Sequence, residues 1–122
     1  MSLIATQVHS LLNDIFPSNP HKRVFSEHYV NFKRQKLFFD FFVPEMNTFV
    51  ECQGEQHIKF VKHFHGDVSN FKAQKYRDNL KIEYVQEKDM YLIRFYEKEK
   101  LTTSLISYKI GEAFDSEFNF FE

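Results

Sequence analysis

The run Leu37-Phe38-Phe39-Asp40-Phe41-Phe42-Val43, followed after a short turn by Thr48-Phe49-Val50-Glu51-Cys52-Gln53, carries the clearest structural signal in this chain of 122 residues. Both runs are rich in Phe and Val, residue types that favour β-strands. An earlier run, over residues 24–32, also has strand character, and a hairpin turn is expected between this run and the one that contains Asp40. The sequence therefore predicts an antiparallel meander of three strands, over residues 24–32, 36–43 and 48–53.

Two helical patterns and a fourth strand pattern surround this meander. Apolar residues recur at helical spacing from Leu3 to Ile15, and the segment from Ser69 to Lys88 has good helix formers with neither Gly nor Pro. Further patterns predict a polar loop over residues 54–67, a strand over 90–96 and a closing helix over 101–114. We therefore expect an α/β fold with the order α-β-β-β-α-β-α, in one domain over residues 1–122.

Composition and charge exclude several classes of protein. Hydrophobic residues make up 43% of the chain, including 16 Phe, which suits a packed core and not a disordered chain. The net charge of −1 argues against a coat protein that holds nucleic acid by bulk charge. It is compatible with an enzyme, because carboxylates that hold metal ions offset lysines and arginines elsewhere. A single cysteine rules out an intrachain disulfide and a cysteine-based zinc cage.

The sequence shows no targeting or membrane signal. Its first residues lack a basic leader ahead of an apolar run, and no apolar stretch approaches the ~20 residues of a membrane helix. We therefore expect an intracellular, cytoplasmic protein that does not enter a membrane. The composition, heavy in Phe, Lys and Asn, is compatible with an AT-rich genome such as that of a phage.

Asp40 and Glu51 stand out because each interrupts an apolar strand. A carboxylate buried without a partner is destabilising, and a tight turn would set these two residues side by side. Two adjacent acids repel each other unless a cation lies between them, and oxygen ligands suit Mg²⁺ or Mn²⁺. Gln53, on the same strand face as Glu51, would orient a water molecule or a phosphate oxygen. The alternative is that both acids form ordinary ion pairs with lysines.

The segments Phe39-Asp40-Phe41-Phe42-Val43-Pro44 and Val50-Glu51-Cys52-Gln53-Gly54-Glu55-Gln56-His57 resemble motifs of the PD-(D/E)XK nuclease superfamily. The branch that they resemble most contains very-short-patch-repair-type endonucleases, their bacterial relatives and similar phage-encoded endonucleases. The resemblance continues in Gln74-Lys75-Tyr76-Arg77-Asp78 with Lys81, and in Tyr91-Leu92-Ile93-Arg94-Phe95-Tyr96. It covers residues 37–101.

This resemblance implies a restriction-endonuclease-like α-β-β-β-α-β core with a C-terminal helix, in which a central mixed sheet is flanked by helices. It also implies a DNA endonuclease that uses Mg²⁺ or Mn²⁺. Asp40 and Glu51 would match the two acids of the motif, and the backbone carbonyl of Cys52 would be a further metal ligand. Gln53 stands where the family most often has lysine. The first helix of the family often carries a glutamate of the site, and here the nearest residue is Gln7.

Residues beyond the two strands complete the expected site. His57 is a candidate general acid or base, with an ordinary loop histidine as the alternative. Gln74, Asp78 and Lys81 share one face of a helix. Lys81 would then replace the missing lysine, Asp78 would orient it, and this helix, with Arg77, would contact nucleic acid. The alternative is a solvated face with a weak Asp-Lys pair.

Two other functions stay open at this point. A nuclease-fold module that no longer cuts, and instead binds nucleic acid or protein, is favoured by Gln53 and Gln7 and disfavoured by the intact Asp40 and Glu51. A transition-metal protein would use the histidines of the polar loop, namely His57, His63 and His65.

The small size and near-neutral charge of the chain bear on how it would grip DNA. A nuclease of this kind is expected to act as a homodimer or with a partner protein. The aromatic residues near the end of the sequence are expected in the core or in an interface, and these are Phe118, Phe120 and Phe121.

Overall fold

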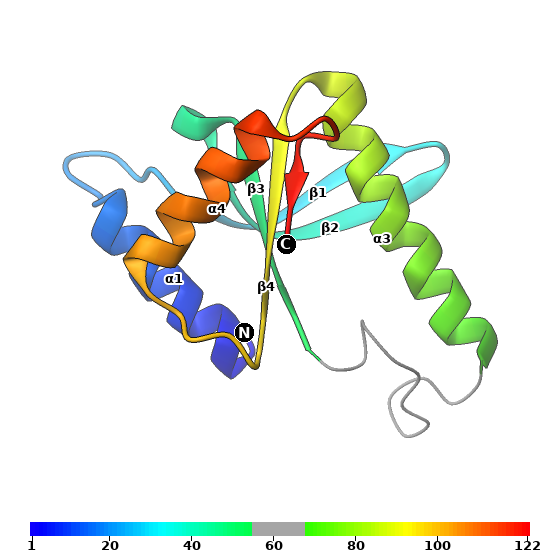
Figure 1. Ribbon diagram of the computed structural model, residues 1–122, viewed down its shortest axis with the longest axis horizontal. Helices are drawn as coiled ribbons and strands as arrows, with labels where there is room; N and C mark the ends of the chain where they lie inside the picture. Colours follow the sequence, from blue (N-terminus) through cyan, green and yellow to red (C-terminus); the bar gives the residue numbers. More distant parts are fainter. Residues whose placement is uncertain (55–67) are drawn as a thin grey trace.

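The computed structural model describes residues 1–54 and 68–122 as a five-stranded sheet between helices (Figure 1). Its elements are α1 (Leu3–Ile15), β1 (Phe25–Phe32), β2 (Gln35–Val43), η1 (Pro44–Met46), β3 (Thr48–Gln53), α3 (Val68–Lys88), β4 (Tyr91–Tyr96), α4 (Thr103–Asp115) and β5 (Phe120–Phe121). Helices α1 and α4 lie on one side of the sheet and α3 on the other. The architecture is therefore an α/β fold of three layers.

The strands follow the order β1-β2-β3-β4-β5 across the sheet. β1, β2 and β3 pair antiparallel, which confirms the predicted meander. β4 pairs parallel with β3 and with β5, so the sheet is mixed. Parallel neighbours need a crossover connection, and α3 lies in the connection between β3 and β4. The register sets Glu51 beside Arg94 and Gln53 beside Tyr96, so these four side chains lie at the carboxyl ends of two neighbouring strands.

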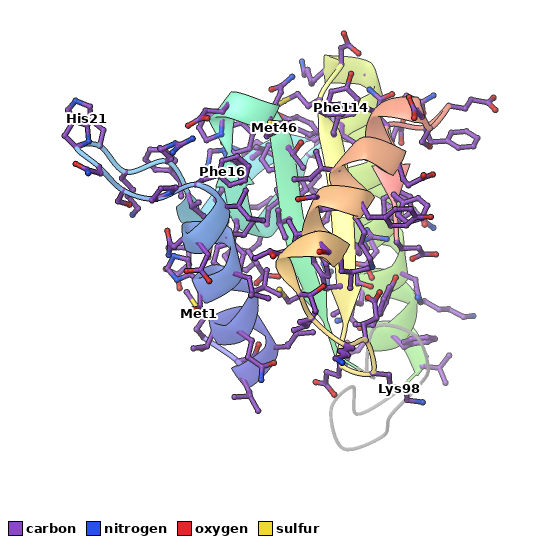
Figure 2. All side chains as sticks on the ribbon, turned by 60° about the vertical axis from the view of Figure 1, so that its left-hand side comes forward. Met1, Phe16, His21, Met46, Lys98 and Phe114 are labelled. Atoms are coloured by element: carbon purple, nitrogen blue, oxygen red, sulfur yellow. The ribbon has the colours of Figure 1, made fainter. Side chains whose placement is uncertain are left out.

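Each face of the sheet has its own apolar core. Side chains of α1 and α4 fill the space on one face, as Figure 2 shows, where Phe16 at the end of α1 lies beside the sheet. The core on the α3 face is smaller and aromatic, and the rings of Phe39 and Phe49 stack there with centroids 4.1 Å apart. Burial of such apolar side chains is the main favourable term in folding. The buried residues of this second core are Phe32, Leu37, Phe39, Phe49, Leu80, Val85 and Leu92.

The helices that flank the first core begin at polar caps. The Ala5 N–H donates to Ser2 Oγ at 3.2 Å, so Ser2 is the N-cap of α1. The Leu105 N–H donates in the same way to Thr102 Oγ1 at 3.0 Å at the start of α4. α1 ends at Phe16, directly before Pro17, because proline cannot continue the hydrogen-bonding ladder of a helix.

Two short elements of the fold were not predicted from the sequence. Residues 44–47 were expected as a plain turn and instead contain the 3₁₀ helix η1, which ends on Asn47 with a left-handed φ of 51°. The two-residue strand β5 is too short to show any periodicity. Its residues pack against the two cores, Phe121 on the α1–α4 face and Phe120 on the α3 face, as expected for core aromatics. Phe118 is 52% exposed.

The side chains along β2 change face at Asp40. Leu37 and Phe39 belong to the core under α3, whereas Phe41 and Val43 belong to the core under α1 and α4. In a regular strand, residues two apart point to the same face. The alternation is therefore broken between Phe39 and Phe41, and Asp40 is the residue at the break.

The neighbouring strand is irregular at the same level. The register between β1 and β2 places Glu27 opposite Asp40, and Glu27 has a φ of 56°, a conformation that side-chain-bearing residues seldom adopt. The ladder between β2 and β3 reaches Phe41 paired with Val50. Asp40 thus lies at the point where β2 leaves β3. No helix in the described segments, 1–54 and 68–122, is long and apolar enough to cross a membrane.

Candidate active site

Asp40 points toward the backbone of β3. The Cys52 N–H donates a hydrogen bond to Asp40 Oδ2 at 2.8 Å. The N–H and C=O groups of one residue in an extended strand point to the same side, so the Cys52 carbonyl also faces the β2 side of β3. The carboxylate and this carbonyl are therefore directed into the same space, beyond the last pair of the β2–β3 ladder. The resemblance to the nuclease superfamily implied that these two groups are neighbouring metal ligands.

Glu51 lies on the α3 face and is nearly inaccessible, with 4% of its surface exposed. Lys81 Nζ, which comes from α3, donates to Glu51 Oε1. Arg94 Nε, which comes from β4, donates to Glu51 Oε2 at 3.0 Å. Both carboxylate oxygens of Glu51 are thus paired with cations. One of these cations, Lys81, is the residue expected to replace the motif lysine, whose position is occupied by Gln53.

Arg94 extends this network across the sheet. Its Nη2 donates to the backbone carbonyl of Asp78 at 2.8 Å, which ties β4 to α3. On the opposite face, Lys109 of α4 is 1% exposed and its Nζ donates to the Arg94 carbonyl at 2.6 Å. Lys109 also pairs with Glu99 at 2.7 Å. A buried polar network therefore connects all three layers at the level of Glu51.

The predicted face of α3 turns toward the sheet. Asp78 is 4% and Lys81 8% exposed, so the alternative of a solvated Asp-Lys face is wrong for these two residues. Gln74 is half-buried and Arg77 is exposed on the same helix. Gln74 and Asp78 each have interaction partners. The helix thus brings Lys81 and the Asp78 backbone to the sheet and leaves Arg77 at the surface.

Gln53 is buried beyond Glu51, at the carboxyl end of β3, with 3% of its surface exposed. Among the described residues, its Nε2 is the buried side-chain nitrogen or oxygen atom that has no hydrogen-bond partner. Gln53 lines a hollow of about 560 Å³ whose other walls include Arg94 and Tyr96. The amide therefore faces a space at the end of β3 with an unused donor.

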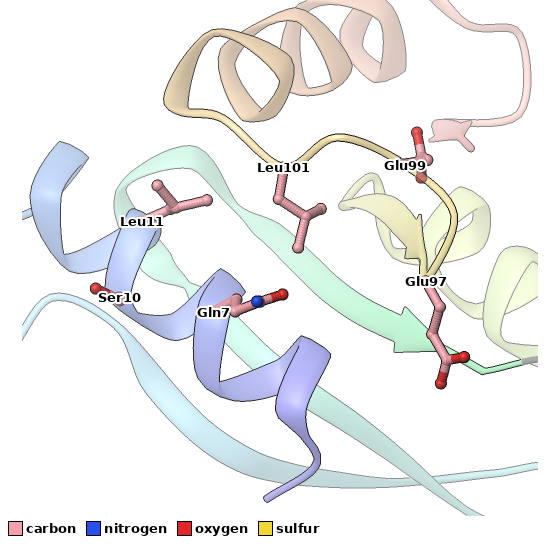
Figure 3. A pocket seen from close by; sticks show the side chains of 6 residues that line it. All are labelled: Gln7, Ser10, Leu11, Glu97, Glu99 and Leu101. Carbon is pink, nitrogen blue, oxygen red and sulfur yellow. The ribbon is translucent and has the colours of Figure 1, made fainter.

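Gln7, the residue nearest to the position of the family's helical glutamate, lies elsewhere. It is exposed on α1, on the opposite face of the sheet from α3. It lines another hollow of about 540 Å³, formed with Ser10 and Leu11 of α1 and with residues that follow β4, namely Glu97, Glu99 and Leu101 (Figure 3). Glu99 also borders the hollow beside Gln53. Gln7 therefore belongs to a different surface from Glu51 and Lys81.

The expected histidine lies outside the described residues. His57 falls in residues 55–67, as do His63 and His65, so the predicted general acid or base and the histidine-rich metal site have no structural counterpart to test. Within residues 1–54 and 68–122, no group of three or more His, Cys, Asp and Glu side chains is arranged to hold a metal ion.

The donor set of the described residues fits Mg²⁺ or Mn²⁺ better than zinc. Mg²⁺ keeps several waters and takes only one or two carboxylates from the protein, which Asp40 and the Cys52 carbonyl can supply with water. Zinc sites use three or four protein side chains, more than this part of the chain brings together. Each Glu51 oxygen accepts one of these hydrogen bonds and keeps a second lone pair, so Glu51 can join the ligands while it stays paired with Lys81 and Arg94.

Cys52 should react slowly with thiol reagents in the folded protein. Burial, together with the negative charges of Asp40 and Glu51, raises the pKa of the Cys52 thiol far above its usual value of 9.0. Since the thiolate is the reactive form, labelling with a disulfide reagent at pH 8 should be much slower in the native protein than in guanidinium. Asp40→Asn should accelerate native labelling by removing one of these charges, and equal native and unfolded rates would contradict this account.

The same shift sets a direction for stability at high pH. The folded pKa of Cys52 is the higher one, so the thiol begins to lose its proton first in the unfolded chain. The free energy of unfolding should therefore be insensitive to this group below pH 9.0 and fall as the pH rises above that value. A Cys52→Ala variant should lose this component of the pH dependence.

Arg94 and Lys109 were not predicted from the sequence as residues of the site. Arg94 interrupts the apolar run of β4 in the same way that Asp40 interrupts β2, so the same signal applies to it. Lys109 follows Ile106 by three residues and therefore lies on the apolar side of α4. A charged residue at a core position of a helix needs a partner. The position of Lys109 in the sequence therefore predicts a buried polar contact but not the residues that make it.

Comparisons with known proteins connect part of the chain to a virus. No protein-family model matches the chain. Over 57 residues it is 39% identical to "Uncharacterized protein 307L" of Invertebrate iridescent virus 6. The matched segment is 47% of this chain and 29% of the viral protein, so the chain spans less than a third of that relative. The comparisons thus relate part of the chain to a viral protein and assign no family.

Proposed function

We propose that this chain is a metal-dependent DNA endonuclease built on a restriction-endonuclease-like core. The observation that carries the proposal is that Asp40 of β2 accepts the Cys52 N–H, where β2 leaves β3, while the adjacent residue Glu51 of β3 pairs with Lys81 of α3. Two acids from adjacent strands, with a lysine held against one of them, are the groups that metal-assisted hydrolysis of a phosphodiester needs.

The two acids have different roles in this proposal. Asp40 and the carbonyl of Cys52 would hold Mg²⁺ or Mn²⁺, with water in the remaining positions. The ion, when bound, lowers the pKa of a water molecule and neutralises charge on the phosphate. Glu51 holds Lys81 and Arg94 in place through its two oxygens. Lys81 supplies a fixed positive charge for the reacting phosphate, and Gln53 and His57 stay candidates for orienting water.

α3 is the element that we propose lies along the DNA. Arg77 and Lys72 are exposed on it, and exposed cations bind phosphates without regard to sequence. Gln74 and Asp78 are the further candidates for contact on this helix. Because the net charge of the chain is −1, we propose that a homodimer or a partner protein supplies additional contacts. The similarity to an iridescent virus protein supports a viral or phage origin.

Cleavage of DNA under controlled metal conditions tests the proposal. Labelled duplex, single-stranded and branched DNA are incubated with the protein in Mg²⁺, Mn²⁺ or EDTA. We expect cleavage with a metal and none with EDTA. Asp40→Asn should cleave about a thousandfold more slowly, because the metal supplies several kcal/mol of stabilisation to the transition state. Asp14→Asn, a change at an exposed acid of α1, should cleave like the wild type.

The comparison is made at equal folded concentration, since Asp40 also accepts the Cys52 hydrogen bond. Circular dichroism and thermal unfolding establish that Asp40→Asn is folded. Cleavage that persists in folded Asp40→Asn at the wild-type rate would contradict the assignment of this carboxylate. Absence of cleavage by the wild type on every substrate would contradict the proposed activity.

A second function, a nuclease-fold module that binds without cutting, is favoured by the pairing of Glu51. Its two oxygens bind two cations. An ion-pair network of this kind can have a purely structural role, in which it holds the fold and takes no part in catalysis. Such a module should bind nucleic acid or protein with the same affinity in EDTA as in Mg²⁺. The affinity of such a module should also be the same in Asp40→Asn as in the wild type. A dependence on metal therefore distinguishes the nuclease from the binding module.

A further inference from the structure

A polar hollow adjoins the candidate active site on the α3 face of the sheet. It has a volume of about 560 Å³ and lies where β3 and β4 end. We call it the β3–β4 pocket, and its lining residues are Gln53, Lys75, Arg94, Tyr96, Glu99 and Glu122. Besides β3 and β4, α3 contributes Lys75, and Glu122 comes from the residue that follows β5. Gln53 stands two residues beyond Glu51, so the pocket borders the proposed cleavage site.

The wall of this pocket contains an unused hydrogen-bond donor. Gln53 has only 3% of its surface exposed, and its Nε2 has no hydrogen-bond partner among the described residues. A buried polar group without a partner is destabilising by roughly 1–3 kcal/mol. Such a group in a native structure calls for a physical reason, and one reason is a ligand that supplies the missing acceptor. The pocket is where that acceptor would lie.

The charges around the pocket favour a neutral ligand. Its lining has two cations, Lys75 and Arg94, and two acids, Glu99 and Glu122. Arg94 is already paired with Glu51, and Glu99 with Lys109. Among the described lining residues, Lys75 and Glu122 carry the remaining charges, which are opposite, so these residues offer an anion such as phosphate no net positive charge. A neutral group with a hydrogen-bond acceptor fits the lining better.

Tyr96 adds an aromatic surface to the same pocket. Its hydroxyl donates to Glu122, which leaves the ring as the group that a ligand would meet. Burial, followed by this hydrogen bond, raises the pKa of the Tyr96 hydroxyl above its usual range, so the ring stays neutral. Aromatic side chains bind bases by stacking, and every nucleobase has a face that can stack.

We propose that the β3–β4 pocket receives one unstacked nucleobase of the DNA, which stacks on Tyr96 and accepts a hydrogen bond from Gln53. This inference rests on the proposed function, because it assumes that nucleic acid lies at the site. The base reaches the pocket either from a single strand or from a duplex that opens locally.

Binding measurements on an intact and an abasic strand test this inference. Fluorescence anisotropy gives the affinity for a labelled oligonucleotide and for the same backbone without bases, both in EDTA so that no cleavage occurs. Tyr96→Ala should weaken binding of the intact strand at least about fivefold, the effect of losing one stacked base. It should leave binding of the abasic strand unchanged. Tyr96→Phe, which keeps the ring, should bind the intact strand like the wild type.

Two controls keep the outcome interpretable. Tyr108→Ala removes an exposed tyrosine of α4 on the other face of the sheet, and it should bind both strands like the wild type. Gln53→Leu keeps the volume of the side chain and removes the donor, so it should weaken only the intact strand. Equal losses on intact and abasic strands in Tyr96→Ala would overturn the inference, because the tyrosine would then act through the fold.

The form of the DNA distinguishes the two sources of the base. Tighter binding to single strands than to a matched duplex, with sensitivity to Tyr96→Ala confined to the single strand, would identify a single-stranded substrate. Equal sensitivity on a duplex that carries a mismatch would identify a base taken out of a helix. Insensitivity of all three to Tyr96→Ala would overturn the inference. Cleavage is measured in a separate assay. A negative result in these binding experiments would therefore overturn the base pocket without contradicting the proposed nuclease activity.

Discussion

Glu51→Ala should destabilise the fold by about 3–5 kcal/mol, the effect of removing one partner from a buried ion pair. Lys81 and Arg94 both donate to the Glu51 carboxylate, and their side chains are 10% and 6% exposed. Without this carboxylate, two cations lie near the aromatic core with no anion paired to them in this network. Urea unfolding at neutral pH measures the loss as a lower midpoint at similar slope.

A surface ion pair provides the matched control for this change. Arg23 pairs with Glu45 through two hydrogen bonds, and both side chains are substantially exposed. Glu45→Ala should therefore shift the unfolding midpoint far less than Glu51→Ala, since solvent screens an exposed pair. Lys81→Met in the Glu51→Ala background should restore part of the lost stability by removing an unpaired charge. Equal effects of the two glutamate changes would contradict the buried network.

Lys81→Met should reduce the cleavage rate by about 10²–10³-fold, the usual effect of removing one electrostatic stabiliser of a transition state. Lys81 lies over the Phe39 ring, with its Nζ 5.4 Å from the ring centroid, and is held by Glu51. Methionine keeps much of the packing of this side chain and removes its charge. The effect should appear in kcat, with the KM for DNA little changed, because the charge acts on the reacting phosphate.

Lys88→Met, at the exposed end of the same helix, is the control for a general loss of positive charge. It should leave kcat unchanged. Arginine at position 81 should restore part of the rate, because it keeps the charge while changing its geometry. A rise in KM without a fall in kcat for Lys81→Met would contradict the proposed role and would mark Lys81 as a DNA-binding residue only.

Much of the fold follows from short-range patterns in the sequence. The Phe- and Val-rich runs that contain Asp40 and Glu51 form β2 and β3, with the short 3₁₀ helix η1 in the connection where a plain turn was expected. The Gly- and Pro-free segment forms α3. The spacing predicts that Asp78 and Lys81 share one face of it, whereas the burial of that face was only implied by the family resemblance. These signals depend on residues close in sequence, so they can be read without knowing the tertiary structure.

The contacts that define the site depend on residues far apart. Glu51 was predicted to meet either a metal ion or lysines, and the structure pairs it with Lys81, which agrees with the second alternative, and with Arg94. The role of Arg94 follows from the parallel register between β3 and β4, which no local pattern specifies. Lys109 reaches the same network from the other face of the sheet. The choice between a metal site and an ion-pair site therefore needs a measurement on the protein.

Calorimetric titration with Mn²⁺ is that measurement, carried out on the wild type and on folded Asp40→Asn. The account predicts that the wild type binds Mn²⁺ and that Asp40→Asn loses this binding, because the Asp40 carboxylate and the adjacent Cys52 carbonyl supply the protein ligands. Mn²⁺ binding of equal strength in both proteins would contradict the assignment of Asp40. Absence of Mn²⁺ binding by the wild type would contradict the nuclease and favour the module that binds without cutting.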